Sequence, residues 1–339
     1  MKSTSWVRFV APVVAALSVA VLAQPAEAAA IRLAWRPTIL PLPPGATAGT
    51  LTGSDGKGEY TGTFRVNDVT QVVSWRNGQP VVRGVPSGYE RVDANDENSS
   101  GVVVGTIHDY QTMSSQVYTL EANGWYQIKD VPAGYDVVDG IAINTRGDVL
   151  GLARRFSGGV GAAVLWRAGG GEPVIIPEGP DTYYARDLDD DGTILFTTGN
   201  SSTLWKDGVI KRLSPSPSGW AVGYAIRNGV VVGSRSWGSE QAARWSSAST
   251  PIVGLEGGGV ALSINKAGLT AGRVPTPSGP EIYGNAIVWR GTTPGEVRGP
   301  SGYSRYSATV VADDGTLAGF AGNGSTDAGG VPVIWRLTP

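Results

Sequence analysis

One feature of this sequence limits the fold more than any other: an aromatic residue that ends a short apolar segment and returns at nearly regular intervals. Copies such as VVSW, AVLW and AIVW end at Trp35, Trp75, Trp166, Trp205, Trp245, Trp289 and Trp335, and Tyr118 takes the remaining place. Successive copies are 39–48 residues apart. Such a period is typical of a chain built from one repeated supersecondary unit.

A second signature accompanies the aromatic residue. Most units contain two glycines four residues apart, with strand-forming residues between them: Gly58/Gly62, Gly101/Gly105, Gly147/Gly151, Gly229/Gly233, Gly268/Gly272 and Gly315/Gly319. The unit of Gly192 has Phe196 at the second place. The 49 glycines and 22 prolines indicate short strands that are separated by tight turns.

Residues 135–178 show how one unit is organised. Four extended segments, YDVVDGIAIN, DVLGLARR, AAVLWRA and EPVIIPE, follow one another with short turns between them. A single four-stranded sheet cannot bury both of its faces, whereas copies packed face to face around an axis can, which predicts a β-propeller. The repeated aromatic residues then form the core between blades: Trp75, Tyr118, Trp166, Trp205, Trp245, Trp289 and Trp335.

The two ends of the repeat array set the expected blade count. The last unit ends at Pro339 after its third strand, and TILPLPP at 38–44 precedes the first unit without a partner. Pairing the two would leave the ring without a free edge. We therefore predict an all-β, seven-bladed propeller of four-stranded antiparallel blades in a single domain, 31–339, with blades at about 45–85, 86–132, 133–179, 180–217, 218–257, 258–300, and 301–339 plus 38–44.

Residues 1–28 have the pattern of a secretory signal peptide. Lys2 and Arg8 precede the apolar run 9–23, and Ala26-Glu27-Ala28 resembles a cleavage site. The run is shorter than the ~20 apolar residues that a membrane-spanning helix needs. We expect a secreted, extracellular protein that is not inserted in a membrane after the signal is removed.

Composition narrows the choice of partners and cofactors. Without residues 1–28 the chain has 25 basic and 28 acidic residues, so no nucleic-acid partner is expected. The chain has no cysteine and one histidine, which excludes sites built from clusters of those residues. No cofactor is expected.

The sequence also resembles a known family. The strings GIAINTRGDVLGLARR, AAVLWRAGGGEPVIIP, ALSINKAGLTAGR and NAIVWRG are similar to the HAF-type extracellular repeats of bacteria. The resemblance covers nearly all of 31–339 and is weakest at 87–130, where Tyr118 replaces tryptophan. It implies export and a propeller-like fold, and it assigns no activity.

The only histidine, His108 in GTIHDYQ, is the one residue around which a Ser-His-Asp arrangement could form. No G-x-S-x-G nucleophile motif accompanies it. We expect His108 to be an exposed polar residue at the start of the loop between the second and third strands. No catalytic residue is assigned.

Recognition is expected on the face where loop lengths vary most, between second and third strands, because variable loops on a rigid scaffold commonly carry binding sites. The candidate binding residues are aromatic side chains in these loops and at the entries to the first strands: Tyr89, Tyr110, Tyr135, Tyr183, Trp220, Trp237, Tyr283 and Tyr303. Rings at the strand entries could instead pin the connections between blades.

These observations predict a secreted, non-enzymatic recognition module that binds a cell-surface glycan or an extracellular protein, as a lectin-like subunit of an exported assembly or alone. One alternative is a carbohydrate-active enzyme with catalytic carboxylates. Another is a structural repeat protein without a ligand.

The segment DLDDDG at 187–192 looks like the start of a calcium loop, with Asp187, Asp189 and Asp191 at alternate positions. Thr198 stands where such a loop needs glutamate. Equivalent Asn and Asp residues recur in other units, so we predict turn chemistry, with Asp191-Gly192 in a type I′ hairpin. A cation held by the three aspartates is the weaker alternative.

Overall fold

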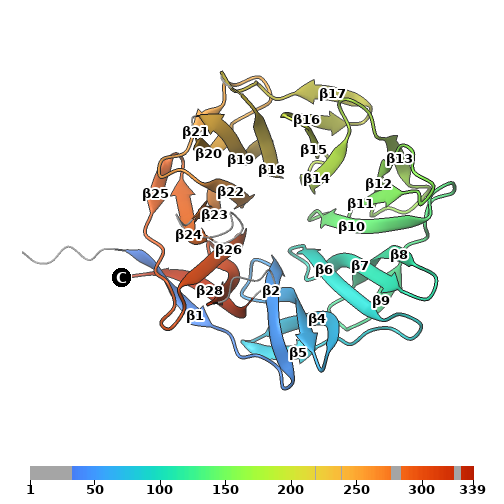
Figure 1. The fold of residues 1–339 in the computed structure, drawn as a ribbon, viewed down its shortest axis with the longest axis horizontal. Coiled ribbons are helices and arrows are strands. Elements are labelled where there is room, and N and C mark those ends of the chain that lie inside the picture. Colours follow the sequence, from blue (N-terminus) through green and yellow to red (C-terminus); the bar gives the residue numbers. More distant parts are fainter. Residues whose placement is uncertain (1–32, 218, 238, 276–283, 324–329) are drawn as a thin grey trace, which may run out of the picture. The chain divides into compact units, whose positions relative to one another are not determined.

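Twenty-eight β-strands make up the regular structure of the residues that the computed structural model describes, which are 33–217, 219–237, 239–275, 284–323 and 330–339. The all-β prediction is confirmed. No helix in these ranges is long and apolar enough to cross a lipid bilayer. Leu33–Pro339 form one unit, in which the sheets surround a central axis (Figure 1).

Five sheets are each formed by four consecutive antiparallel strands. The first two are β2 to β5 (Ala46–Ser54, Tyr60–Val66, Val69–Arg76, Gln79–Val82) and β6 to β9 (Arg91–Glu97, Val103–Asp109, Ser114–Leu120, Tyr126–Ile128). The next are β10 to β13 (Val137–Ile143, Val149–Arg154, Ala162–Trp166, Val174–Pro177) and β14 to β17 (Tyr184–Leu188, Ile194–Thr198, Ser201–Lys206, Val209–Arg212). The fifth is β18 to β21 (Ala221–Arg227, Val230–Trp237, Ser239–Trp245, Val253–Gly254).

The remaining strands form two groups that are joined by one parallel pair, Asn285 with Tyr306. One group is β22 to β25 (Val260–Ile264, Leu269–Pro275, Gly284–Arg290, Thr293–Gly295). The other is β26 to β28 (Arg305–Val311, Leu317–Gly322, Val331–Thr338) with β1 (Ala34–Ile39) antiparallel to β28.

The N-terminal strand lies earlier in the sequence than predicted. Its register on β28 runs from Ala34 opposite Thr338 to Ile39 opposite Val333, whereas the prediction placed the strand at 38–44. The prolines at 41, 43 and 44 have no N–H to donate to a ladder, which explains why the pairing ends before them.

The first strand of each group lies nearest the centre of the ring (Figure 1) and contains a β-bulge. A bulge adds one unpaired residue and increases the local twist. One extra residue from each of these strands lines a central cavity, while a second bulge in β2, at Thr47, lies outside it. The lining residues are Thr52, Asn95, Ile141, Arg186, Tyr224, Leu262 and Thr309. The strand that faces the axis therefore presents a side chain to the channel where regular pleating would not.

A close backbone approach beside the bulge explains the second glycine of most pairs, although Phe196 takes this place opposite the bulge of β14. A Cβ added to Gly233 would lie 1.9 Å from the carbonyl oxygen of Val222, and one added to Gly319 would lie 1.9 Å from that of Ser307. Both carbonyls belong to the first strand beside its bulge. Only glycine allows so close an approach of the two backbones.

The repeated aromatic residues lie between sheets. Trp75, Trp245, Trp289, Trp335 and Tyr118 are fully buried, Trp205 is nearly so, and Trp166 is half-buried. Several indole N–H groups donate to a carbonyl of the segment that enters the same sheet, such as Trp75 to Pro41 at 2.8 Å and Trp245 to Ser214 at 2.8 Å. Each of these tryptophans thus fills a core and holds the connection from the preceding sheet.

Candidate functional site

A cavity of about 710 Å³ opens between the sheet of β6 to β9 and the sheet of β10 to β13. We call it the interblade pocket. Its lining includes Asp93, His108, Tyr110, Met113, Ser115, Asp139, Arg154, Phe156 and Tyr184. Its volume lies within the range of roughly 300–1,000 Å³ that is usual for small-molecule sites.

The alternation of side chains along β6 explains why this pocket is polar. Val92 and Ala94 are buried in the cluster that faces the first sheet, so Arg91 and Asp93 point to the opposite side. Deeper in the same interface, Val104 packs with Val138 of β10. The interface is therefore apolar around Val104 and Val138, and it is polar around Asp93 and His108, toward the loop between β7 and β8.

His108 and Asp93 form the central contact of the pocket. The imidazole Nε2 lies 3.0 Å from Asp93 Oδ2, and Arg91 donates to both carboxylate oxygens, at 2.8 and 3.0 Å. Burial alone would raise the pKa of Asp93, but the hydrogen bonds from His108 and Arg91 outweigh it and hold this pKa below its usual value. Asp93 is thus ionised at neutral pH, and its carboxylate accepts a hydrogen bond from an N–H at Nε2 of His108.

The placement of His108 differs from the prediction. The residue lies inside β7 rather than in a loop, and only a quarter of its side chain is exposed (25%). It stands opposite Arg91 on one side and Ser115 on the other in the strand register. The sheet therefore fixes the ring on both sides.

A second polar pair lies beside His108 and links the two sheets that form the pocket. Ser115 Oγ donates to Asp139 Oδ1 at 2.8 Å, and Arg154 forms an ion pair with the other oxygen of Asp139. Thr106 Oγ1 accepts the backbone N–H of Gly140 at 3.0 Å. These contacts join the two sheets below the pocket and keep its walls at a fixed separation.

The rim of the pocket is apolar and aromatic. The exposed fractions of Tyr110, Met113, Phe156 and Tyr184 are 52%, 69%, 63% and 38%. The rings of Tyr110 and His108 are neighbours, with centroids 6.2 Å apart. A ligand could thus contact apolar side chains while its reactive atoms meet the polar floor.

Three of the predicted binding aromatics belong to tight turns and pack against buried clusters. Tyr89, Tyr135 and Tyr303 each end a Pro-x-Gly-Tyr turn, in which the tyrosine N–H bonds the proline carbonyl. Their rings pack against the buried clusters of the neighbouring sheets. The geometry at these three positions matches the alternative in which the rings pin the connections between blades.

The other predicted aromatics do not gather at one place. Tyr110 lines the interblade pocket, Tyr183 is exposed outside it, and Trp220 is half-buried at the entry to β18. The side chain of Trp237 and all of Tyr283 lie outside the described residues. Sequence reasoning missed Asp93, Ser115, Asp139 and Arg154, although a period-two reading of RVD and TIH places Asp93 and His108 on one face.

The central cavity, of about 200 Å³, is smaller than the interblade pocket, and its lining includes the half-buried carboxylates of Asp96 and Asp187, whose oxygens point into the protein. Asp96 Oδ2 accepts the N–H of Ile143 at 3.0 Å, and Asp187 Oδ2 accepts that of Ile226 at 2.7 Å. Burial, together with the charge of Asp187, raises the pKa of Asp96 to about 7. Each carboxylate therefore bridges its own first strand to a neighbouring one.

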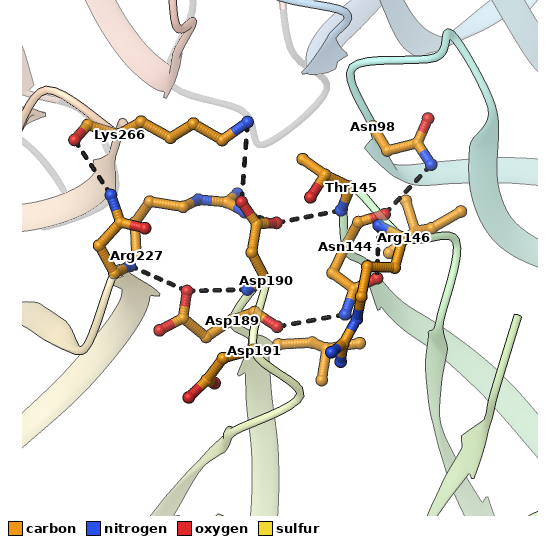
Figure 2. Close-up of polar contacts among 12 residues, drawn as sticks. Asn98, Asn144, Thr145, Arg146, Asp189, Asp190, Asp191, Arg227 and Lys266 are labelled. Atoms are coloured by element: carbon orange, nitrogen blue, oxygen red, sulfur yellow. Dashed lines mark hydrogen bonds and ion pairs between the residues drawn. The ribbon is translucent and has the colours of Figure 1, made fainter.

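The DLDDDG segment joins its own sheet to three others through hydrogen bonds and ion pairs (Figure 2). Asp189 accepts the N–H groups of Asn228 at 2.9 Å and Gly229 at 2.7 Å. Asp190 accepts the N–H of Thr145 at 3.0 Å and pairs with Arg227 at 3.0 Å. Within the described ranges, no group of three or more His, Cys, Asp or Glu side chains is placed to hold a metal ion.

The turn itself is of a different type from the one predicted. Gly192 has a positive φ of 85°, but Asp191 does not, and the N–H of Gly192 bonds the carbonyl of Asp189 at 2.9 Å. This is a type I turn followed by a left-handed glycine rather than a type I′ turn. Asn228-Gly229, with φ values of 52° and 72°, has the positive dihedrals of type I′.

The repeated four-stranded antiparallel sheets around an axis define a β-propeller. Solved structures with this fold include a streptogramin B lyase (12% identical, covering 90% of this chain and 98% of that one, TM-score 0.56). They also include the virginiamycin B lyase of Staphylococcus aureus (14%, 91% and 100%, TM-score 0.51) and the propeller domain of the trilobed protease of Pyrococcus furiosus (10%, 86% and 95%, TM-score 0.56). No protein-family profile and no curated protein matches the chain in sequence.

These comparisons contradict the prediction of a non-enzymatic recognition module. Two of the similar folds belong to lyases and a third is the propeller domain of a protease, so the prediction of a binder, lectin-like or otherwise, is withdrawn. At identities of 10–14% the likeness concerns the fold, so the chemistry has to be argued from the residues of this chain.

Proposed function

We propose that this chain is an enzyme in which His108 is the general base and Asp93 orients it, at the floor of the interblade pocket. The observation that carries this proposal is the 3.0 Å contact between His108 Nε2 and Asp93 Oδ2 inside a cavity of small-molecule size. A carboxylate that holds one ring nitrogen leaves the other with its lone pair available to accept a proton.

The proposed reaction is bond cleavage that begins with proton abstraction. His108 Nδ1 takes a proton either from a bound water, whose oxygen then displaces the alkoxide of an ester or lactone, or from the carbon beside a carbonyl group, whose electron pair then forms a C=C bond and expels the β-substituent. The ionised carboxylate of Asp93 stabilises the resulting imidazolium, which gives its proton to the leaving group. Arg91, bound to both oxygens of Asp93, keeps that carboxylate in place. Tyr110 and Phe156 offer apolar surface to the rest of the substrate.

Matched variants test the assignment. The parent, His108→Gln and Asp93→Asn would be assayed on a panel of small lactones, activated esters and β-substituted carbonyl compounds. We expect the turnover number of His108→Gln to be roughly 10²–10⁴-fold lower than that of the parent, which is the usual contribution of a general base.

Asp68→Asn is the control, since the side chain of Asp68 is 88% exposed and belongs to a surface ion pair. Turnover that survives in His108→Gln at the level of the parent would show that the base is elsewhere.

We also propose that the ring has seven four-stranded blades, with β1 completing the blade of β26 to β28. The antiparallel register of β1 on β28 supports this closure. A chain that begins at residue 41 should unfold at a lower temperature than one that begins at residue 31, because it leaves β28 as an open edge. Equal midpoints would argue against closure.

We further propose that residues 1–28 are a signal peptide for export and that the chain belongs to the HAF-type repeat proteins. The signal-like pattern of residues 1–28 and the repeat strings support them. In an extracellular setting, glycans and secreted proteins are the molecules that the chain would meet. No nucleic-acid or membrane partner is proposed.

A further inference from the structure

One arginine on the channel wall is held in place without a carboxylate partner. Arg186 is the extra residue of the bulge in β14, and its side chain is exposed. Its guanidinium carbon lies 4.5 Å from the ring centroid of Tyr184 and 5.7 Å from that of Tyr224. Its Nε donates to Thr197 Oγ1 at 3.2 Å. Two rings and one hydroxyl therefore fix the plane of the group.

Two other arginines near the cavities are neutralised by acidic residues, whereas Arg155, which also lines the interblade pocket, donates to the carbonyl of Gly134 and lies over the ring of Tyr135. Arg227 pairs with Asp190 at 3.0 Å, and Arg154 pairs with Asp139. No carboxylate in the described part of the chain lies within ion-pair distance of Arg186. Its two terminal nitrogens keep four N–H donors for a molecule from outside.

The position of Arg186 connects the channel to the interblade pocket. Tyr184, on which the guanidinium stacks, lines that pocket together with His108. Asn95 and Ile141 line both the pocket and the central cavity, so the two share a wall. A ligand in the pocket can thus extend past Tyr184 toward Arg186.

We propose that Arg186 binds an anionic group of the substrate, so that the enzyme acts on small molecules that carry a carboxylate or a phosphate. The planar fork of arginine matches the two oxygens of such groups, and aromatic stacking presents it ready to bind. This inference rests on the proposed function for its substrate, but the binding of an anion at Arg186 can be measured without turnover.

Calorimetric titration with phenylacetate and phenyl phosphate, and with benzyl alcohol as the uncharged probe, tests the inference on the full chain. We expect the anions to bind and benzyl alcohol to bind more weakly. Arg186→Gln should weaken anion binding roughly tenfold or more, as expected for loss of charge-assisted hydrogen bonds. Arg186→Lys keeps the charge but not the planar pair of N–H donors, so its affinity for the anions should lie between those of the parent and Arg186→Gln.

Arg212→Gln is the matched control, because Arg212 is a 70% exposed arginine on the outer strand β17. It removes the same charge and should bind the anions as the parent does. Equal binding by the parent and Arg186→Gln, absence of anion binding by the parent, or equal loss in Arg212→Gln would each overturn the inference. Preference for one anion identifies the class as carboxylate or phosphate.

The two proposals fail separately. If His108→Gln turns over as the parent does while Arg186→Gln no longer binds the anionic probes, the general base is refuted and the anion site is supported. Unchanged probe binding in Arg186→Gln refutes the anion site and leaves the general base standing when His108→Gln loses turnover.

Discussion

Replacing Asp189 with alanine should destabilise the folded chain by about 3 kcal/mol, whereas the same change at Asp191 should have little effect. Only 2% of Asp189 is exposed. Its carboxylate accepts two N–H groups of the Asn228-Gly229 turn, which belongs to the neighbouring sheet. Loss of the carboxylate would therefore weaken the contact between two sheets rather than a local turn.

The magnitude follows from those two hydrogen bonds. A hydrogen bond to a charged group contributes about 1.5–3 kcal/mol, which gives about 3–6 kcal/mol for the pair. The low end applies because Asn228 and Gly229 are exposed and water can replace part of the lost contact. The side chain of Asp191 is 55% exposed and pairs with Lys206, an arrangement that contributes about 0–1 kcal/mol.

Urea unfolding followed by tryptophan fluorescence would measure the difference. We expect Asp189→Ala to lower the midpoint without a change of slope, Asp189→Asn to lie between it and the parent, and Asp191→Ala to coincide with the parent. If the free energies of unfolding of the two alanine variants agreed within about 1 kcal/mol, the role given to Asp189 as a bridge between sheets would be refuted.

Three further outcomes are expected. Burial raises the pKa of Glu97 from 4.5 to about 7. Between these pH values the folded chain keeps a proton that the unfolded chain releases. The free energy of unfolding should therefore fall as pH rises from about 4.5 to about 7 and then level off. Glu97→Gln should match the parent near pH 5 and exceed its unfolding free energy by about 2–3 kcal/mol at pH 8, as measured by urea titration at both pH values. A parent more stable at pH 8 than at pH 5 by that amount would contradict this. Trp245→Phe should lose about 1–2 kcal/mol through the missing bond to Ser214, and Trp245→Ala about 3–5 kcal/mol through the cavity, with equal effects arguing against a role for the indole N–H. Calcium and chelator should leave the thermal midpoint unchanged, because the aspartates at 187–191 already have protein partners, and a rise with calcium would restore the metal hypothesis.

The architecture was predictable because its signals are local and repeated. A buried tryptophan such as Trp75 needs a large apolar site in every copy, and a glycine such as Gly233 is needed wherever the first strand approaches closely. Both requirements recur at the same spacing, so the sequence shows the four-stranded units and their order. The end of the array was harder to read, since Ile39 still pairs with β28 but the following prolines do not.

The candidate site was much less predictable. The reading of His108 as a loop residue followed from the end of its apolar run, yet the ladder with Ser115 continues the strand to Asp109. Asp93 is 15 residues away in sequence and became its partner only through the register of β6 on β7. No short motif announces such a pair.

By itself, then, the sequence determined the repeated unit, its strands and their stacking, because hydrophobic period and turn chemistry act over a few residues. The tertiary structure decided which polar side chains meet. Each bulge shifts one residue to the other face, so Arg186 enters the channel where simple alternation would not predict it. Its contact with Tyr224, like that of Ser115 with Asp139, crosses from one sheet to the next. Such contacts depend on how sheets dock, and no local pattern encodes them.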